Sequence, residues 1–269
     1  MRTPWLSTGD GRTGIPFLVN TVRSPNWVRV WLPLSDGEVL ALDVAFPKGG
    51  HDTTQPVYMV LHGLNGGSNE EYVKDFTLRR TEEEGATVIV MIARGLMDLP
   101  IRGMDVFHGA RWEDPHQAAL AIRNAVVPGQ ILAGVGYSMG AIILGNMVSR
   151  TGVECALDVA VAISGGLDTR YELDVPRAQR LWQPLLIKQL RDHFAIGKWG
   201  ERVRHRLTKI QMKALMRTTH ISDFDRTAVV AYHGYRDLIH YYSEMSVLGD
   251  VPFPSNEYNG PILPPVRRM

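Results

Sequence analysis

The hydrophobic pattern divides the first two thirds of the chain into short apolar runs separated by amphipathic segments. Val28–Leu32 and Val39–Phe46 flank the turn-forming residues Ser35–Glu38, and this arrangement predicts two antiparallel strands. Four later runs are apolar at almost every position, which is typical of strands buried on both faces of a parallel sheet. These runs are Pro56–Leu61, Thr87–Ala93, Gln130–Ala133 and Leu157–Ile163. Because helical patterns alternate with them, the sequence predicts an α/β fold with a mostly parallel sheet and right-handed crossovers.

Helices are expected between these strands, and one long loop is expected as well. A helix over about Glu70–Glu84 is expected to be capped by Ser68 or Asn69. The 17 residues Leu96–Trp112 have no helical or strand pattern, and a loop of this length usually has a functional or shaping role. Asp114 and Pro115 open the next helix, which runs to about Val127.

The domain organisation follows from changes in composition. We expect an irregular lead-in over residues 1–25, an α/β domain over 26–250 and an irregular proline-rich tail over 251–269. Residues 174–220 are helical and basic, and they form either a cap over the sheet or extra helical packing with a solvated basic face. Tyr232–Met245 is expected to be a helix rich in tyrosine.

Composition narrows the class of protein. The chain has 269 residues, 45% of them hydrophobic and 21% charged, which is globular composition, and its net charge of +1 gives no support for nucleic-acid binding. Its single cysteine, Cys155, fits a reducing compartment. No signal peptide and no run of about 18 apolar residues is present, so we expect a cytoplasmic protein, with peripheral membrane contact left open. No spacing indicates a metal site or a nucleotide cofactor, and none is expected.

The most informative motif is GVGYSMG at Gly134–Gly140. It lies between an apolar strand and a helical segment, which is the order of a nucleophile elbow. Such a turn leaves no space for side chains two residues before and after the serine, and Gly136 and Gly140 occupy those positions. Ser138 is therefore the predicted nucleophile. In the alternative interpretation, Ser138 only caps the following helix.

A serine nucleophile needs N–H donors for the oxyanion, a base and an acid that orients the base. The backbone N–H of Met139 is one expected donor, and the second is expected near Leu64 in the glycine-rich loop after the first parallel strand. His62 begins this loop, and we expect it to shape the loop through hydrogen bonds rather than to act as the base.

Six motifs in the same order carry a family resemblance. They are HGLNGGSNEEYV, Ala93-Arg94-Gly95, HGARWEDPHQAAL, GYSMGAIILGNMV, ISGGLD and HGYRDLIHYY. Over about residues 25–245 the chain resembles the YheT-like branch of the α/β hydrolases, AB hydrolase family 4. The resemblance implies a serine carboxylesterase or lipase that acts on acylglycerols, phospholipids or small esters. It also implies Ser138 as nucleophile, the His62–Leu64 loop as oxyanion hole, and a cap over an acyl pocket after Asp168.

The chain departs from the family after the tyrosine-rich segment. Family members continue with two strands that carry an Asp and then a His, whereas this chain ends 29 residues after His240. The remaining histidines downstream of the elbow fit surface or packing roles better, so the acid and the base stay unassigned; they are His193, His205, His220, His233 and His240. Asp237 lies four residues after His233 and three residues before His240 on one expected helix. This fold does not build its catalytic relay from neighbours on one helix.

Without the two final strands, the strand at Leu157–Ile163 is expected to be an open edge with an uncovered apolar face. A truncated form or a catalytically impaired binding protein is therefore the alternative to an active hydrolase.

Overall fold

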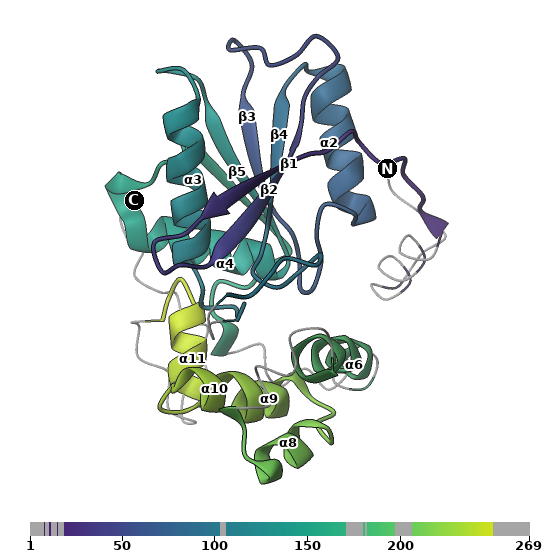
Figure 1. Ribbon diagram of the computed structural model, residues 1–269, viewed down its shortest axis with the longest axis vertical. Coiled ribbons are helices and arrows are strands. Elements are labelled where there is room, and N and C mark those ends of the chain that lie inside the picture. The colour runs from purple at the N-terminus through teal and green to yellow at the C-terminus, as the bar shows by residue number, and fades with distance from the viewer. Residues whose placement is uncertain are drawn as a thin grey trace.

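The computed structural model describes residues 19–102, 106–170, 182–196 and 206–249, together with the isolated residues 8, 11, 15 and 180. Its centre is a six-stranded sheet with the order β1-β2-β4-β3-β5-β6 (Figure 1). β1 and β2 are antiparallel, β2 is antiparallel to β4, and the remaining pairs are parallel. The strands are β1 (Val28–Pro33), β2 (Val39–Ala45), β3 (Val57–Leu61), β4 (Thr87–Ile92), β5 (Leu132–Tyr137) and β6 (Val159–Ile163).

Helices cover both faces of this sheet and form a separate cap. The helices of the sheet domain are α2 (Glu71–Glu83), α3 (Glu113–Ala125), α4 (Met139–Thr151) and the short η1 (Gly152–Glu154). Those of the cap are α6 (Gln183–Arg191), η3 (Asp192–Ile196), α8 (Lys209–Leu215), α9 (Ile221–Phe224), η4 (Asp225–Val230), α10 (Ala231–His233) and α11 (Leu238–Met245). The predicted mixed sheet, with its antiparallel hairpin and its alternating helices, is confirmed.

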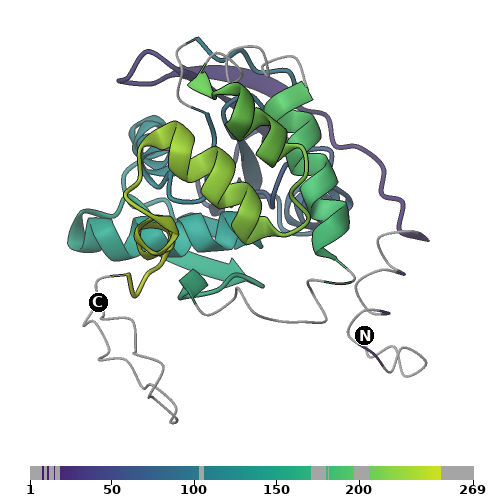
Figure 2. The ribbon, with the colours of Figure 1, turned by 90° about the horizontal axis from the view of Figure 1, so that it is seen from below.

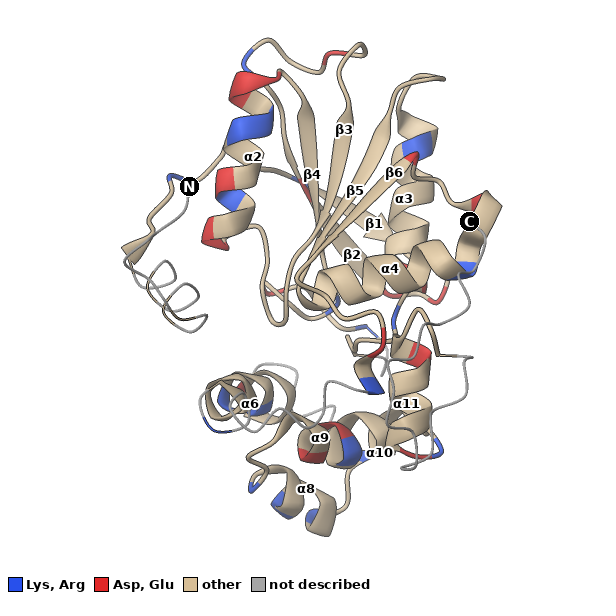
Figure 3. Cartoon of the chain, turned by 180° about the vertical axis from the view of Figure 1, so that it is seen from behind, with Lys and Arg blue, Asp and Glu red and all other residues tan. Residues whose placement is uncertain are grey.

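Alternate residues of the strands build two apolar layers. On one face, α3 and α4 pack on positions such as Leu42 and Met59, whereas α2 packs through Val73 on the opposite face, on positions such as Val60 and Val90. This two-sided burial explains why the central strands are apolar at every position. The helices of both layers therefore pack on the sheet. The carboxyl ends of β3, β4 and β5 lie side by side and face the cap (Figures 1 and 3).

A buried arginine ties three elements together beside the sheet. Arg94, just after β4, forms a bidentate ion pair with Asp114 in the first turn of α3, with distances of 2.5 and 2.6 Å, and a second ion pair with Asp36 at 2.7 Å. Burial lowers the pKa of Arg94, but the hydrogen bonds and charges of the two carboxylates outweigh it and raise the pKa above its ordinary value. The guanidinium therefore stays charged and holds the β1–β2 turn against α3.

The expected cap of α2 is wrong. The residue before α2 is Glu70, and it makes no side-chain capping bond. The hydroxyl of Ser68 instead donates to Asp43 on β2, at 2.5 Å, and the same carboxylate accepts from Arg29 at 2.7 Å. Because the buried carboxylate of Asp43 needs these donors, tertiary contact takes Ser68 away from the helix end.

The cap helices share one apolar cluster with the long loop that precedes α3. This cluster contains Phe194, Leu215 and Tyr241 from the cap, together with Ile101 and Val106 from the loop (Figure 2). The described parts of the loop, residues 96–102 and 106–112, therefore pack between the sheet and the cap, which fits a shaping role. Of residues 174–220, which were expected to form the cap, positions 174–179, 181 and 197–205 lie outside the described part of the chain.

The helix expected over Tyr232–Met245 is interrupted, and this correction affects the relay candidates. Gly234 has a φ of 73°, a left-handed conformation that ends α10. The next helix, α11, starts after Asp237, whose carboxylate accepts from the backbone N–H of His240 at 2.7 Å. Asp237 is thus a helix cap and does not pair with the imidazole of His240.

β6 is the last strand among the described residues, and none of them pairs with its outer side. Its five residues are all exposed, including Val159, Val161 and Ile163. This is the open apolar edge that the sequence analysis expected. In the part of the chain that the structure describes, no helix combines the length and the apolar character needed to cross a bilayer.

One cap carboxyl group is buried in apolar surroundings. Asp225 on η4 lies in the cap core, and the hydroxyl of Tyr242 on α11 donates to it at 2.8 Å. Burial raises the pKa of Asp225 from 3.8 to about 7. The folded chain therefore binds a proton that the unfolded chain releases, so the stability from this proton is complete below pH ~4 and is lost as the pH rises through about 7.

Replacing Asp225 by Asn tests this linkage. Asp225→Asn keeps an acceptor for Tyr242 but cannot ionise, so its free energy of unfolding should match the wild type near pH 4 and exceed it near pH 8 by on the order of a few kcal/mol. Urea unfolding at several pH values measures the difference. Asp223→Asn, at an exposed position on α9, is the matched control and should give a nearly constant difference. Parallel stability curves for Asp225→Asn and the wild type would contradict the assignment.

Candidate functional site

The sharp turn between β5 and α4 holds Ser138 in an unusual backbone conformation. Ser138 has a φ of 51° and a ψ of −119°, and its side chain is exposed at the carboxyl end of the sheet. A side chain at Gly136 would place its Cβ 2.5 Å from the carbonyl oxygen of Gly140, and one at Gly140 would lie 2.3 Å from the carbonyl oxygen of Leu61. Both glycines are thus required by the packing of the turn, as the motif predicted.

The strand β6 supports the turn from the other side. The backbone N–H of Ser138 donates to the carbonyl oxygen of Ile163 at the end of β6, at 2.9 Å. Just after β6, a Cβ at Gly165 would lie 2.6 Å from the side chain of Ala141, so the chain there passes directly against α4. The backbone of Ser138 is therefore held by neighbouring segments on both sides.

The loop after β3 places Gly63 against the serine. A Cβ at Gly63 would be 3.4 Å from Cβ of Ser138. The Gly63 N–H is already used, since it donates to the hydroxyl of Tyr72 at 2.8 Å. By contrast, neither Leu64 nor Met139 donates its backbone N–H to any acceptor among the described residues. The two N–H groups named from the sequence are therefore free, and they belong to the two segments that meet at Ser138.

His62 is committed to the structure of this loop. Its Nδ1 lies 2.7 Å from the carbonyl oxygen of Gly63, and its Nε2 accepts from the N–H of Ala93 at 3.3 Å. Burial lowers the pKa of His62, which keeps the ring neutral with its proton on Nδ1. With both nitrogens engaged, His62 has the loop-shaping position expected from the sequence and no free nitrogen for the serine.

Two polar residues of this site lie within the motif HGLNGGSNEEYV, but the sequence analysis assigned neither of them a role. Tyr72 on α2 holds the Gly63 N–H and packs on Tyr137, with ring centroids 4.9 Å apart, and burial raises its pKa to about 12, so it stays a neutral phenol. Asn65 has a φ of 52°, and its buried Nδ2 has no hydrogen-bond partner among the described residues. An asparagine in a glycine-rich loop suggests a left-handed position, but its unpaired amide is visible only in three dimensions.

The histidines downstream of the elbow have other local contacts. His220 lies 3.0 Å from the hydroxyl of Thr219, and His240 accepts from the N–H of Arg236 at 3.2 Å. The ring of His233 packs on that of His108, with centroids 4.3 Å apart, and burial lowers the pKa of His193. The hydroxyl of Ser138 has no side-chain partner among the described residues, and His205 lies outside them. No group of at least three His, Cys, Asp or Glu residues within the described part could hold a metal ion.

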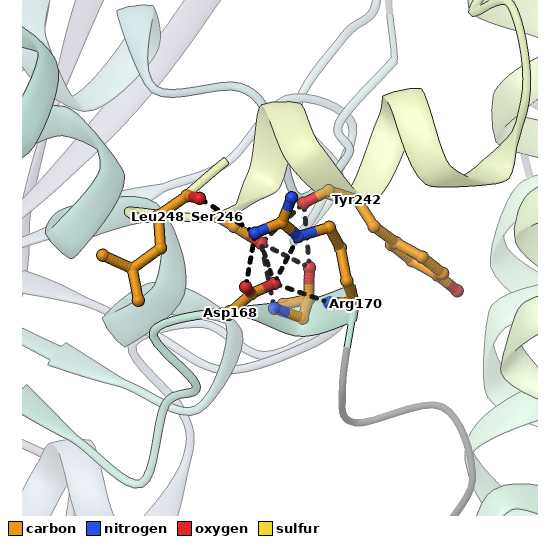
Figure 4. Close-up of polar contacts among 6 residues, drawn as sticks. Asp168, Arg170, Tyr242, Ser246 and Leu248 are labelled. Carbon is orange, nitrogen blue, oxygen red and sulfur yellow. Dashed lines mark hydrogen bonds and ion pairs between the residues drawn. The ribbon is translucent and has the colours of Figure 1, made fainter. Parts of the chain in front are cut away.

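A polar cluster after β6 fastens the cap to the sheet domain (Figure 4). Arg170 forms a bidentate ion pair with Asp168, at 2.6 and 2.8 Å, and also donates to the carbonyl oxygen of Leu248 at 2.9 Å. Next to it, the backbone N–H of Thr169 donates to the hydroxyl of Ser246 at 2.9 Å. Arg170 and Thr169 thus join the loop after β6 to the end of α11, next to Asp168, after which the resemblance places the cap.

The cap also reaches the residue after the serine. Met139 packs on the cap cluster, and a Cβ at Gly109 would lie 3.0 Å from Sδ of Met139 and 2.4 Å from Cε of Met245. The long loop is therefore enclosed between the elbow and α11. Apolar side chains of the cap therefore contact the residue that follows Ser138.

Adding a methyl group at the elbow tests the steric requirement. Gly136→Ala and Gly140→Ala should each destabilise the protein by about 1–3 kcal/mol or more, because their Cβ atoms meet backbone atoms that cannot rotate away. Urea unfolding gives the free energies. Gly49→Ala is the matched control, since it has free space around it and an ordinary φ, and it should be nearly neutral. Equal effects at all three positions would contradict the tight turn.

Comparison with known proteins identifies related sequences. The chain is 23% identical to the protein abhd-3.2 of Caenorhabditis elegans, over 90% of this chain and 64% of that one. It is 25% identical to a monoacylglycerol lipase of Saccharomyces cerevisiae, over 77% and 46%, and 26% identical to YheT of Escherichia coli, over 84% and 64%. The chain thus spans about half to two thirds of the length of these relatives. No family model matches it.

Among solved structures, a bacterial brefeldin A esterase has a TM-score of 0.47 at 16% identity, over 72% of this chain and 60% of that one. The strand order and the strained serine turn are those of an α/β-hydrolase fold. Over most of its length, the chain is similar in sequence to ABHD-type and YheT-like α/β hydrolases.

Proposed function

We propose that this chain is the serine-bearing unit of a carboxylic ester hydrolase, with Ser138 as its nucleophile. The observation that carries the proposal is the conformation of Ser138. Its positive φ costs energy, and the turn fits only because Gly136 and Gly140 flank it. A serine that merely caps α4 would bond the helix N-terminus, and Ser138 makes no such bond. The names lipase and esterase among the related proteins agree with this chemistry.

The proposed reaction is acyl transfer in two steps. The Ser138 oxygen attacks the ester carbonyl carbon while a general base takes the hydroxyl proton, and the carbonyl oxygen becomes an oxyanion. The N–H groups of Leu64 and Met139 would stabilise this oxyanion, and the alcohol leaves with a proton. Water then attacks the acyl-enzyme and releases the carboxylic acid. His62 is excluded as the base by its two hydrogen bonds within the loop.

The proposed substrates are esters with an apolar acyl group, such as acylglycerols, phospholipids or short esters. The support is the apolar contact between the elbow and the cap, where Met139 packs on the cap cluster that includes Met245. An acyl chain buried there would lose water contact, which favours binding by the hydrophobic effect. The proposed compartment is the cytoplasm, because the half-buried Cys155 is a free thiol and thiols stay reduced there.

A second function uses the same site without turnover. In this alternative the chain binds an acyl ligand or a partner, because two residues considered for the relay have structural roles. His62 holds the loop, and Asp237 caps α11. Both alternatives predict ligand binding beneath the cap, and only the first predicts covalent chemistry at Ser138.

Covalent labelling separates these alternatives. A fluorophosphonate reagent should modify the wild-type protein at one site, found by peptide mass spectrometry at Ser138, and p-nitrophenyl butyrate should be hydrolysed. Ser138→Ala should lose both reactions, whereas Ser149→Ala, which replaces a serine further along α4, should retain them. Folded wild-type protein that neither reacts with the reagent nor hydrolyses the ester would reject the enzyme and leave the binding protein.

Asn65 supplies a more specific prediction. We expect its free Nδ2 to donate to bound substrate beside the oxyanion loop, because an unpaired buried donor is costly until a ligand accepts from it. Asn65→Asp replaces the donor by a carboxylate and should lower kcat/KM for the ester by about tenfold or more. Asn65→Gly, which suits the left-handed φ, should lower kcat/KM to a similar extent without loss of thermal stability. Unchanged kinetics in a stable Asn65→Gly protein would show that the amide has no role.

A further inference from the structure

Basic residues are concentrated in one part of a nearly neutral chain. Residues 174–220 contain eleven Lys and Arg residues but only three Asp and Glu residues, although the whole chain has a net charge of +1. The remainder of the chain is therefore acidic on balance. Neither the fold of the cap nor the proposed reaction at Ser138 requires this separation of charge.

The helix α8 has two different faces. Leu215 is fully buried and Met212 packs beside it against the cap cluster, so this side fixes the helix to the cap. The opposite side exposes Lys209, Ile210 and Lys213, and no acidic residue occurs on α8. Ile210 is 82% exposed, so this basic face also carries a large aliphatic side chain.

α8 lies at the outer end of the molecule. It forms the end of the cap farthest from the sheet, and its visible charges are basic (Figure 3). Its N-terminus has a complete capping box between Thr208 and Gln211. At its other end, the guanidinium of Arg191 from α6 donates to the carbonyl oxygen of Met216 at 2.8 Å. The exposed isoleucine is therefore presented on a fixed helix.

We propose that the outer face of α8 docks on an anionic lipid surface. Ile210 would enter the boundary between headgroups and acyl chains, while Lys209 and Lys213 would contact the anionic headgroups. A lipid surface satisfies both kinds of side chain at once. Single-stranded nucleic acid would be recognised through stacking aromatic side chains as well as charge, and α8 has none.

Docking through α8 would bring the cap end of the molecule to the bilayer. The carboxyl ends of the parallel strands, and Ser138 with them, face that same end (Figures 1 and 3). Esters in the bilayer would then lie on the side of the cap. The binding itself does not rest on hydrolysis, so it can be measured in a protein that lacks the serine hydroxyl.

Vesicle flotation with the full chain carrying Ser138→Ala tests the proposal. The protein should float with vesicles of phosphatidylcholine and phosphatidylserine, stay in solution with vesicles of phosphatidylcholine alone, and dissociate as salt is added. Reversing two charges in Lys209→Glu/Lys213→Glu should reduce partitioning by more than about tenfold, since each basic residue near such a surface contributes about fivefold. Ile210→Asn should reduce it as well, but with little change in the dependence on salt.

Matched controls use exposed positions outside the cap. Lys48→Glu/Arg79→Glu reverses two exposed charges, and Val153→Asn replaces an aliphatic side chain that is 100% exposed on η1. Both should bind vesicles as the parent does, and all variants should unfold at similar temperatures.

Absence of flotation, equal binding to neutral and anionic vesicles, or equal losses in the control variants would overturn the proposal. Binding of single-stranded RNA that depends on Lys209 and Lys213, in place of vesicle binding, would also overturn it. Because the parent already lacks the Ser138 hydroxyl, failure of the proposed hydrolysis leaves these outcomes unchanged.

Discussion

The close approach of three backbone segments around Ser138 is the constraint on which the rest of the structure depends. β5 must turn into α4 within a single residue, and the carbonyl oxygen of Leu61 leaves space there only for a glycine at position 140. The left-handed backbone of Ser138 costs on the order of 1–3 kcal/mol and persists because neighbouring segments fix it. The buried parallel strands provide that rigidity, since helices pack on both of their faces.

The same crowding organises the groups that surround the serine. The loop after β3 passes against Ser138. The N–H of Gly63 donates to the hydroxyl of Tyr72, whereas the next N–H, that of Leu64, has no acceptor among the described residues. On the other side, Met139 starts α4, where the first N–H groups have no partner within the helix. Two unpaired donors beside one exposed hydroxyl form an arrangement suited to an oxyanion. Packing of the turn therefore places these donors and the hydroxyl together.

Much of this could be predicted from the sequence, because the relevant signals are local. Runs of apolar residues marked most buried strands to within two positions, although the run Gln130–Ala133 stops four positions before the end of β5. The glycine spacing in GVGYSMG indicated the elbow. The features that were missed depend on contacts between distant segments. Ser68 does not cap α2 because Asp43, 25 positions earlier, accepts from its hydroxyl. Tyr72 and Asn65 lie within the motif HGLNGGSNEEYV, but their contacts at the site depend on the path of the loop after β3.

The central claim is that Ser138 and the N–H groups of Leu64 and Met139 act together on one carbonyl. A crystal structure of the protein after reaction with a fluorophosphonate measures this directly, because the phosphoryl oxygen of the adduct stands in for the oxyanion. The account predicts phosphorus bonded to Oγ of Ser138, with its oxygen about 2.7–3.1 Å from both N–H nitrogens. An adduct on another residue, or a phosphoryl oxygen directed away from these two donors, would contradict it.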